Sequence, residues 1–133
     1  MKEVWKDIEG YEGIYQISNT GKVKSVERKA ERENRGDIHI KEKILKTQVL
    51  KNGYEKIDLF CKGKRKSFYI HRLVAATFIP NLEMKIDVNH INGIKTDNRV
   101  ENLEWATRSE NMKHAFDIGL CEITELQRES SIH

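Results

Sequence analysis

The stretch from Val88 to Trp105 gathers residue types that could hold a metal ion beside a proton acceptor. It reads VNHINGIKTDNRVENLEW and contains one histidine, His90. A histidine titrates near neutral pH and can take a proton from water, and amide oxygens suit hard cations such as Mg²⁺. Its asparagines are Asn89, Asn92, Asn98 and Asn102. A surface loop could have this composition by chance, so the surrounding elements must decide between the two interpretations.

Two short strands and a helix are expected around this histidine. Asp87–Ile91 and Leu103–Ala106 are apolar enough for strands, with a polar loop between them. Thr107 followed by Glu110 has the spacing of a capping box, which predicts a helix from Arg108 to about Asp117. Neighbouring side chains on a strand point to opposite faces. Asn89 and His90 can therefore share a site only at a bend, or in a wide site between strand and helix.

The segment before this site reads as an antiparallel meander. Residues 1–26 are expected to form short strands, and residues 27–43 a long loop or a mobile hairpin. Tyr54–Leu59 alternates as a half-buried strand does, and His71–Phe78 predicts a short helix. His71 could be a ligand, although a histidine at a strand-to-helix junction is more often structural.

Basic charge is concentrated in the middle of the chain. The formal net charge of the chain is only +3, yet residues 22–72 carry 16 basic and seven acidic side chains, a net charge of +9. Residues 1–21 and 73–133 carry net charges of −2 and −4. This asymmetry predicts binding to a polyanion, although a solvated lysine-rich surface would have the same composition.

Composition argues against a membrane protein and against a thiolate metal site. Hydrophobic residues make up 38% and charged residues 34% of 133 residues, which fits one small domain with a modest core. No apolar run approaches the roughly 18 residues of a membrane span. The N-terminus lacks the apolar core of a signal peptide, so we expect a cytoplasmic protein without a membrane partner. Cys61 and Cys121 form no CxxC pair, and we expect both to be reduced.

Several motifs together resemble the HNH nuclease family of the ββα-metal superfamily. The carrying residues are Asn89-His90 with Asn92-Gly93, Asn102-Leu103-Glu104-Trp105, and Ser109-Glu110-Asn111 with His114. The N-terminal WKDIEGYEGIYQISNTGKVKS resembles the NUMOD4-type DNA-binding motif fused to such nucleases in phage and homing endonucleases. FYIHRLVAATFIPN is similar to the connection found in that subfamily.

The resemblance implies an α+β fold, an N-terminal antiparallel β meander followed by a ββα-metal HNH nuclease motif. Residues 1–70 would form a β-rich DNA-binding region, with the NUMOD4-like motif at about 3–26. Residues 71–117 would form the HNH nuclease region with its leading helix. Residues 118–133 would be a C-terminal tail.

The resemblance also implies a metal-dependent endonuclease that hydrolyses phosphodiester bonds of double-stranded DNA, of homing type or phage-encoded. His90 would be the general base, and Asn102 would hold the loop that orients it. Asn89, Asn111 and His114 would be metal ligands, for one Mg²⁺ or Mn²⁺ in each active site. A monomer is favoured, located in the host cell cytoplasm if the gene belongs to a phage.

One residue departs from the family pattern. Many relatives carry an aspartate before the base histidine, where this chain has Asn89, and a neutral ligand binds a cation more weakly. Either DNA adds the missing charge, or Asp87 contributes, or activity is weak. The alternative is therefore a catalytically weak or inactive DNA-binding protein. The residues expected to contact DNA are Lys22, Lys24, Arg28, Lys51, Lys62, Lys64, Arg65, Lys66 and Arg108.

Overall fold

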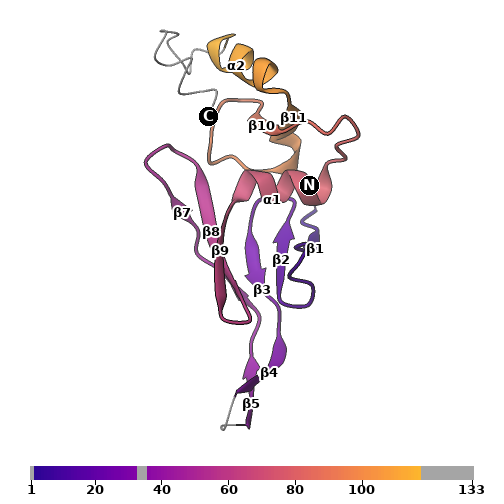
Figure 1. Cartoon of the computed structure of the whole chain (residues 1–133), viewed down its shortest axis with the longest axis vertical. Coiled ribbons are helices and arrows are strands. Elements are labelled where there is room, and N and C mark those ends of the chain that lie inside the picture. Colours follow the sequence, from indigo (N-terminus) through magenta and orange to yellow (C-terminus); the bar gives the residue numbers. More distant parts are fainter. Residues whose placement is uncertain (1, 33–35, 118–133) are drawn as a thin grey trace.

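The computed structural model describes residues 2–32 and 36–117, with backbone only at residues 30–32, 111 and 114–117. Helix α1 (Ile70–Phe78) lies across the middle of the molecule (Figure 1). The N-terminal β-sheets lie on one side of α1, and a short hairpin with helix α2 (Arg108–Asp117) lies on the other. This antiparallel, mixed architecture confirms the expected α+β class.

The first sheet is built from the N-terminal strands, as the sequence predicts. Its order is β1 (Trp5–Asp7), β2 (Tyr15–Ser18), β3 (Val23–Ser25) and β6 (Lys43–Ile44), and all its pairings are antiparallel. Between β3 and β6 the chain forms a separate hairpin, β4 (Arg28–Arg32) with β5 (Gly36–Ile40). Of the two expected alternatives for this segment, the structure therefore shows a hairpin. It projects from the end of the molecule opposite α2 (Figure 1).

The second sheet continues the meander with β7 (Gln48–Val49), β8 (Glu55–Cys61) and β9 (Lys64–Tyr69). The turn into β8 contains Gly53 at φ 89°, a left-handed conformation that glycine adopts without a steric penalty. The second turn joins β8 to β9 and carries the basic side chains of residues 62–66. The predicted strand–turn–strand order is confirmed here.

A single apolar core joins both halves of the chain. Ile17, Leu59 and Val74 are fully buried in it, and Val88 and Leu103 extend it into the β10–β11 hairpin. Helix α1 ends at Phe78 because Pro80 disfavours helical geometry in the residue before it. The predicted boundary between residues 70 and 71 thus runs through a continuous core, so the described residues on either side of it pack as one unit.

The last two strands and α2 form a compact ββα unit. Strands β10 (Asp87–His90) and β11 (Leu103–Ala106) pair antiparallel, preceded at β11 by a 3₁₀ turn over Val100–Asn102. The capping box of α2 is present: Glu110 accepts from the Thr107 N–H at 2.8 Å, and the Glu110 N–H donates to Thr107 Oγ1 at 3.1 Å. These elements match their predicted bounds to within one residue. Gly119, a residue type that commonly ends a helix, lies outside the described residues.

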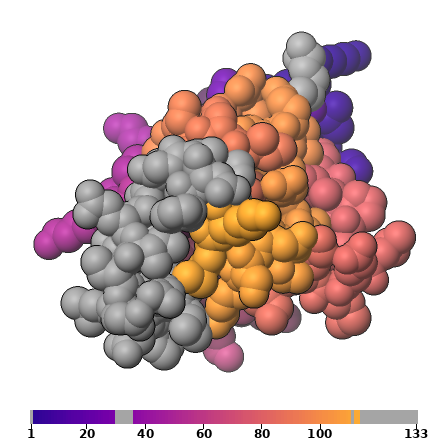
Figure 2. All heavy atoms as spheres, turned by 90° about the horizontal axis from the view of Figure 1, so that it is seen from above, coloured from indigo at the N-terminus to yellow at the C-terminus, as the bar shows by residue number. Residues whose placement is uncertain are grey.

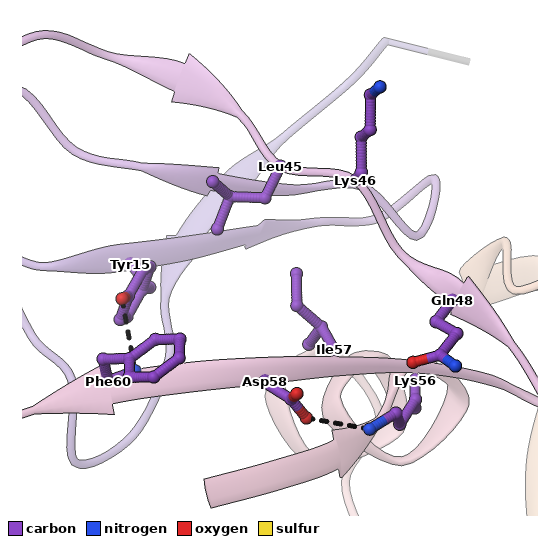
Figure 3. Close-up of a pocket in the computed structure, with 8 residues that line it drawn as sticks. All are labelled: Tyr15, Leu45, Lys46, Gln48, Lys56, Ile57, Asp58 and Phe60. Carbon is purple, nitrogen blue, oxygen red and sulfur yellow. Dashed lines mark hydrogen bonds and ion pairs between the residues drawn. The ribbon is translucent and has the colours of Figure 1, made fainter. Parts of the chain in front are cut away.

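A cavity of about 270 Å³ lies beside β8, lined by residues of β2, β7 and β8 and by Leu45 and Lys46 (Figure 3). Its walls carry the aromatic rings of Tyr15 and Phe60 and the ion pair of Lys56 with Asp58, at 3.1 Å. The Tyr15 hydroxyl accepts a hydrogen bond from the Phe60 N–H at 3.2 Å, which ties β2 to β8. In the described part of the chain, no helix is long and apolar enough to cross a membrane.

Candidate active site

The two strands of the β10–β11 hairpin place His90 and Asn89 on opposite faces. His90 is paired with Leu103 and Asn89 with Glu104. His90 therefore faces the α1 side, where Leu103 joins the core, whereas Asn89 faces the α2 side. Figure 2 shows α2 at the surface against this hairpin. His90 is the last residue of its strand, so the predicted site must lie across the strand end.

His90 is held in a buried polar and aromatic setting. It is 5% exposed, and its Nε2 lies 2.7 Å from Oδ1 of Asn98. The ring centroid lies 5.0 Å from that of His71 and 6.0 Å from that of Tyr54. Among the described residues, no hydrogen bond reaches Nδ1 of His90. An amide oxygen can only accept, so Nε2 carries the hydrogen and Nδ1 holds the free lone pair.

The electrostatic setting keeps His90 neutral. Burial lowers the pKa of the His90 imidazole, although its hydrogen bond to Asn98 and the charge of Asp97 act in the opposite direction. A neutral imidazole with a free Nδ1 is the form that can accept a proton from water. Its partner His71 is still more strongly affected: burial lowers the pKa of His71 to about 3, so this ring is neutral as well.

The amide of Asn89 uses its nitrogen in a hydrogen bond within the described part of the chain, but not its oxygen. The side chain is 6% exposed, and its Nδ2 donates to Glu104 Oε1 at 2.9 Å. Its Oδ1 accepts no hydrogen bond from any described residue. An amide oxygen that accepts no hydrogen bond from a described residue, beside a carboxylate, fits a hard divalent cation. The other two expected ligands, Asn111 and His114, lie on α2, and their side chains are outside the described part of the chain.

Asn102 organises the loop between the two strands. Its Nδ2 donates to Asn92 Oδ1 at 2.9 Å and to the Asp97 carbonyl at 2.8 Å, while its Oδ1 accepts from the Asn92 N–H at 3.0 Å. Asp97 is held in turn by Arg99, whose guanidinium lowers the pKa of that carboxyl to about 2. The loop-holding role expected for Asn102 therefore has a geometric basis.

The expected DNA-contacting residues differ in whether their charged groups already have partners within the protein. Lys24 pairs with Glu42 at 2.9 Å and lies over the Trp5 ring, and Arg28 Nη1 donates to the Val26 carbonyl at 2.9 Å. These two cations are engaged inside the protein. Arg108 lies 3.9 Å from Asp87 at the start of α2. The remaining side chains are exposed, namely Lys22, Lys51, Lys62, Lys64, Arg65 and Lys66.

Sequence reasoning missed three of the side chains around His90. Asn98 lies in the polar loop expected between the two strands and is not among the predicted site residues, yet its amide contacts the imidazole directly. Glu55 begins β8 and accepts from Asn98 Nδ2 at 2.8 Å. Tyr54 stacks on His71 with ring centroids 5.0 Å apart. The alternation of Tyr54–Leu59 marked a strand, but nothing local indicated that its first residues would meet a loop more than forty positions away.

An antiparallel hairpin with a helix packed against it and a buried histidine at the end of one strand is the arrangement expected of the ββα-metal class of nucleases. The chain matches the NUMOD4 motif over residues 3–60 and an HNH endonuclease family over residues 68–113. It therefore belongs to the HNH endonuclease family, in the group that carries a NUMOD4 motif before the nuclease region. The earlier resemblance to this family is confirmed.

Known relatives agree with this assignment. DNA endonuclease I-HmuI of Bacillus phage SP01 is 39% identical over 128 residues, covering 96% of this chain and 66% of I-HmuI. The HNH endonuclease L247 of Acanthamoeba polyphaga mimivirus is 42% identical over 132 residues, covering 92% of this chain and 28% of L247. A solved structure of the HNH homing endonuclease I-HmuI, described for DNA binding and cleavage, superposes with a TM-score of 0.74 at 40% identity. That match covers 97% of this chain and 67% of the I-HmuI chain.

The chain spans about two thirds of the length of I-HmuI and less of the other curated relatives. HNH endonucleases in general depend on a divalent metal.

Proposed function

We propose that this chain is a metal-dependent endonuclease that hydrolyses phosphodiester bonds of double-stranded DNA. The observation that carries the proposal is the setting of His90: a buried neutral imidazole whose Nε2 is bound by Asn98 and whose Nδ1 has no hydrogen bond from any described residue. This is the arrangement of a general base. Its position at the end of β10 places it one residue from the free amide oxygen of Asn89, so one phosphate lying across the strand end can meet both.

Each residue has a defined part in this proposal. His90 Nδ1 takes the proton of the attacking water, and Asn98 stabilises the ring through Nε2. Asn102 holds the loop against the strand. Asn89 Oδ1, with Asn111 and His114 of α2, would hold one Mg²⁺ or Mn²⁺. Such an ion would supply positive charge to the phosphoryl and leaving oxygens.

The exposed cations of the β8–β9 turn are proposed to bind the DNA backbone. Lys62, Lys64, Arg65 and Lys66 are all exposed at or next to this turn. A two-stranded ribbon fits the major groove of DNA, and phosphate contacts fix its position. Lys24 and Arg28 are left out of this proposal because their charged groups already have partners inside the protein.

The proposal is tested by incubating the protein with supercoiled plasmid and magnesium. We expect conversion to open-circle or linear DNA in the wild type. His90→Ala should reduce the rate by about 100-fold or more, as expected for loss of a general base. EDTA should stop the reaction, and added Mn²⁺ should restore it. As a matched control, His39→Ala removes a half-exposed histidine of β5 and should leave the rate unchanged.

The competing function is DNA binding without catalysis, which the neutral Asn89 favours. Under that alternative, the plasmid would stay supercoiled with magnesium and with manganese, yet shift on a gel. His90→Ala would then bind DNA as the wild type does, and the nuclease proposal would be rejected.

A further inference from the structure

A series of hydrogen bonds between polar side chains connects His90 to Glu55, the first residue of β8. His90 Nε2 lies 2.7 Å from Asn98 Oδ1, and Asn98 Nδ2 donates to Glu55 Oε1 at 2.8 Å. The other carboxylate oxygen, Oε2 of Glu55, accepts a hydrogen bond from the Thr47 hydroxyl. This series of hydrogen bonds therefore starts outside the ββα unit, in the sheet that precedes α1.

We propose that Glu55 is a positioning residue that, through Asn98, fixes the orientation and the tautomer of the His90 imidazole. This inference rests on the proposed function, because it assigns the reason why Nδ1 of His90 is the atom left free. No other described residue of the ββα unit makes a hydrogen bond to the ring that would determine this choice.

The direction of each hydrogen bond determines the tautomer of His90. A carboxylate can only accept, whereas an amide group can turn by half a rotation and exchange its donor and acceptor ends. With Glu55 on one side, Asn98 must present its NH₂ to the carboxylate and its oxygen to His90. The histidine must then donate from Nε2. Without the carboxylate, the amide could turn, and His90 would accept at Nε2 and carry its hydrogen on Nδ1.

The other neighbours of His90 restrict the ring but cannot select its tautomer. Tyr54 and His71 pack against it through ring contacts, and their centroids lie 6.0 and 5.0 Å away. Such contacts confine the ring plane, but they do not distinguish a nitrogen that carries hydrogen from one that does not. Only the bond to Asn98 does so among the described contacts of the ring.

One turn of the N-terminal region, between β2 and β3, holds Asn98 in place. A Cβ added at Gly21, which has φ 92°, would lie 3.0 Å from the Cβ of Asn98. The backbone of this turn therefore packs directly against Asn98. The Val100 N–H donates to the Asn19 carbonyl at 2.8 Å. Asn98 is only 3% exposed, so water does not compete freely for its amide. The position of this amide is thus determined by segments outside the ββα unit.

The test compares three variants: Glu55→Ala, Asn98→Ala and the double variant that carries both substitutions. Asp58→Asn is the matched control. Asp58 is a carboxylate on the same strand whose partners are Lys56 and Ser67, so its removal should leave the rate unchanged. We expect Glu55→Ala to lower kcat about 10- to 100-fold, as loss of an outer hydrogen-bond partner does. Affinity for an uncleaved duplex should stay within about twofold. The double variant should be no slower than Asn98→Ala alone, because Glu55 acts only through that amide.

A second readout separates this role from a general loss of structure. The ¹⁵N spectrum of the histidine rings distinguishes the two neutral tautomers of His90. We expect the Nε2–H form in the wild type and in Asp58→Asn, and a mixture with the Nδ1–H form in Glu55→Ala. Glu55→Gln, which can either accept or donate, should give an intermediate mixture and an intermediate kcat.

The proposal is overturned if Glu55→Ala keeps the wild-type kcat, or if kcat falls while His90 remains in the Nε2–H form. It is also overturned if the losses of Glu55→Ala and Asn98→Ala add in the double variant. The spectrum can be recorded without DNA or metal. A wild type that lacks nuclease activity would reject the proposed function, but it would leave the tautomer measurement as an independent test of Glu55.

Discussion

His71 should make the protein lose stability as the pH falls from 7 to 5. Its side chain is 6% exposed, and its Nδ1 is buried without a hydrogen-bond partner. Burial, reinforced by the neighbouring His90 and Arg72, lowers the pKa of the folded-state imidazole from 6.5 to about 3. The unfolded chain therefore takes up a proton first on acidification. The contribution of His71 to stability is greatest above pH 6.5 and decreases until about pH 3.

The magnitude follows from the two pKa values of the His71 imidazole. Between 6.5 and about 3, each pH unit costs about 1.4 kcal/mol, because only the unfolded chain is protonated there. From pH 7 to pH 5 the loss from this residue amounts to about 2 kcal/mol. That is a sizeable part of the 5–15 kcal/mol typical of a domain. Carboxylates with lowered pKa, such as Asp97, contribute mainly below this window.

Urea denaturation at pH 7 and pH 5 measures this loss as a change in the free energy of unfolding. His71→Phe keeps a flat ring against Tyr54 and removes the titrating group, so its stability should fall by about 2 kcal/mol less than that of the wild type. His39→Gln, which removes a half-exposed histidine, should follow the wild type. If His71→Phe loses as much stability as the wild type, burial of a neutral His71 is not the cause and the reasoning fails.

Two further predictions concern the metal site and the DNA surface. Asn89→Asp puts a second carboxylate where the amide now donates to Glu104 at 2.9 Å, so the metal-free protein should lose about 1–2 kcal/mol of stability, and calorimetric titration should show tighter Mg²⁺ binding. Unchanged Mg²⁺ affinity would remove Asn89 from the ligand set. Log affinity for DNA falls as log salt concentration rises. In binding titrations, the double variant Lys64→Gln/Arg65→Gln should make this slope about 2 less steep, if each side chain contacts one phosphate. A slope equal to that of the wild type would place the DNA elsewhere.

The elements that local patterns define could be predicted from the sequence. The capping box of Thr107 and Glu110 located the start of α2, and the apolar residues around His90 located both strands of its hairpin. These signals act within a few residues, so tertiary contacts did not alter them. The loop-holding role of Asn102 came instead from the family resemblance, and its hydrogen bonds to Asn92 and Asp97 are of the kind that role requires.

Contacts between distant segments could not be predicted in this way. Asn98 and Glu55 are 43 positions apart, and their hydrogen bond depends on how two sheets pack around α1. The same limit applies to the basic residues. Lys24 and Arg28 were expected to be surface cations, yet Lys24 pairs with Glu42 and Arg28 donates to the carbonyl of Ile14. Composition gives the charge of a segment, but not which charges remain free for a ligand.

The position of Glu55 also bears on how the two halves of the chain work together. The NUMOD4 match covers residues 3–60 and therefore includes Glu55 as well as the Gly21 turn that touches Asn98. A module that only delivered the nuclease to DNA would need no contact with the base histidine. Here the same module contributes to the apolar core and to the hydrogen-bond chain that ends at His90 Nε2. Separating the two at residue 70 would therefore expose core residues and leave Asn98 without its carboxylate, so the ββα unit depends on the preceding sheets for the geometry of its base.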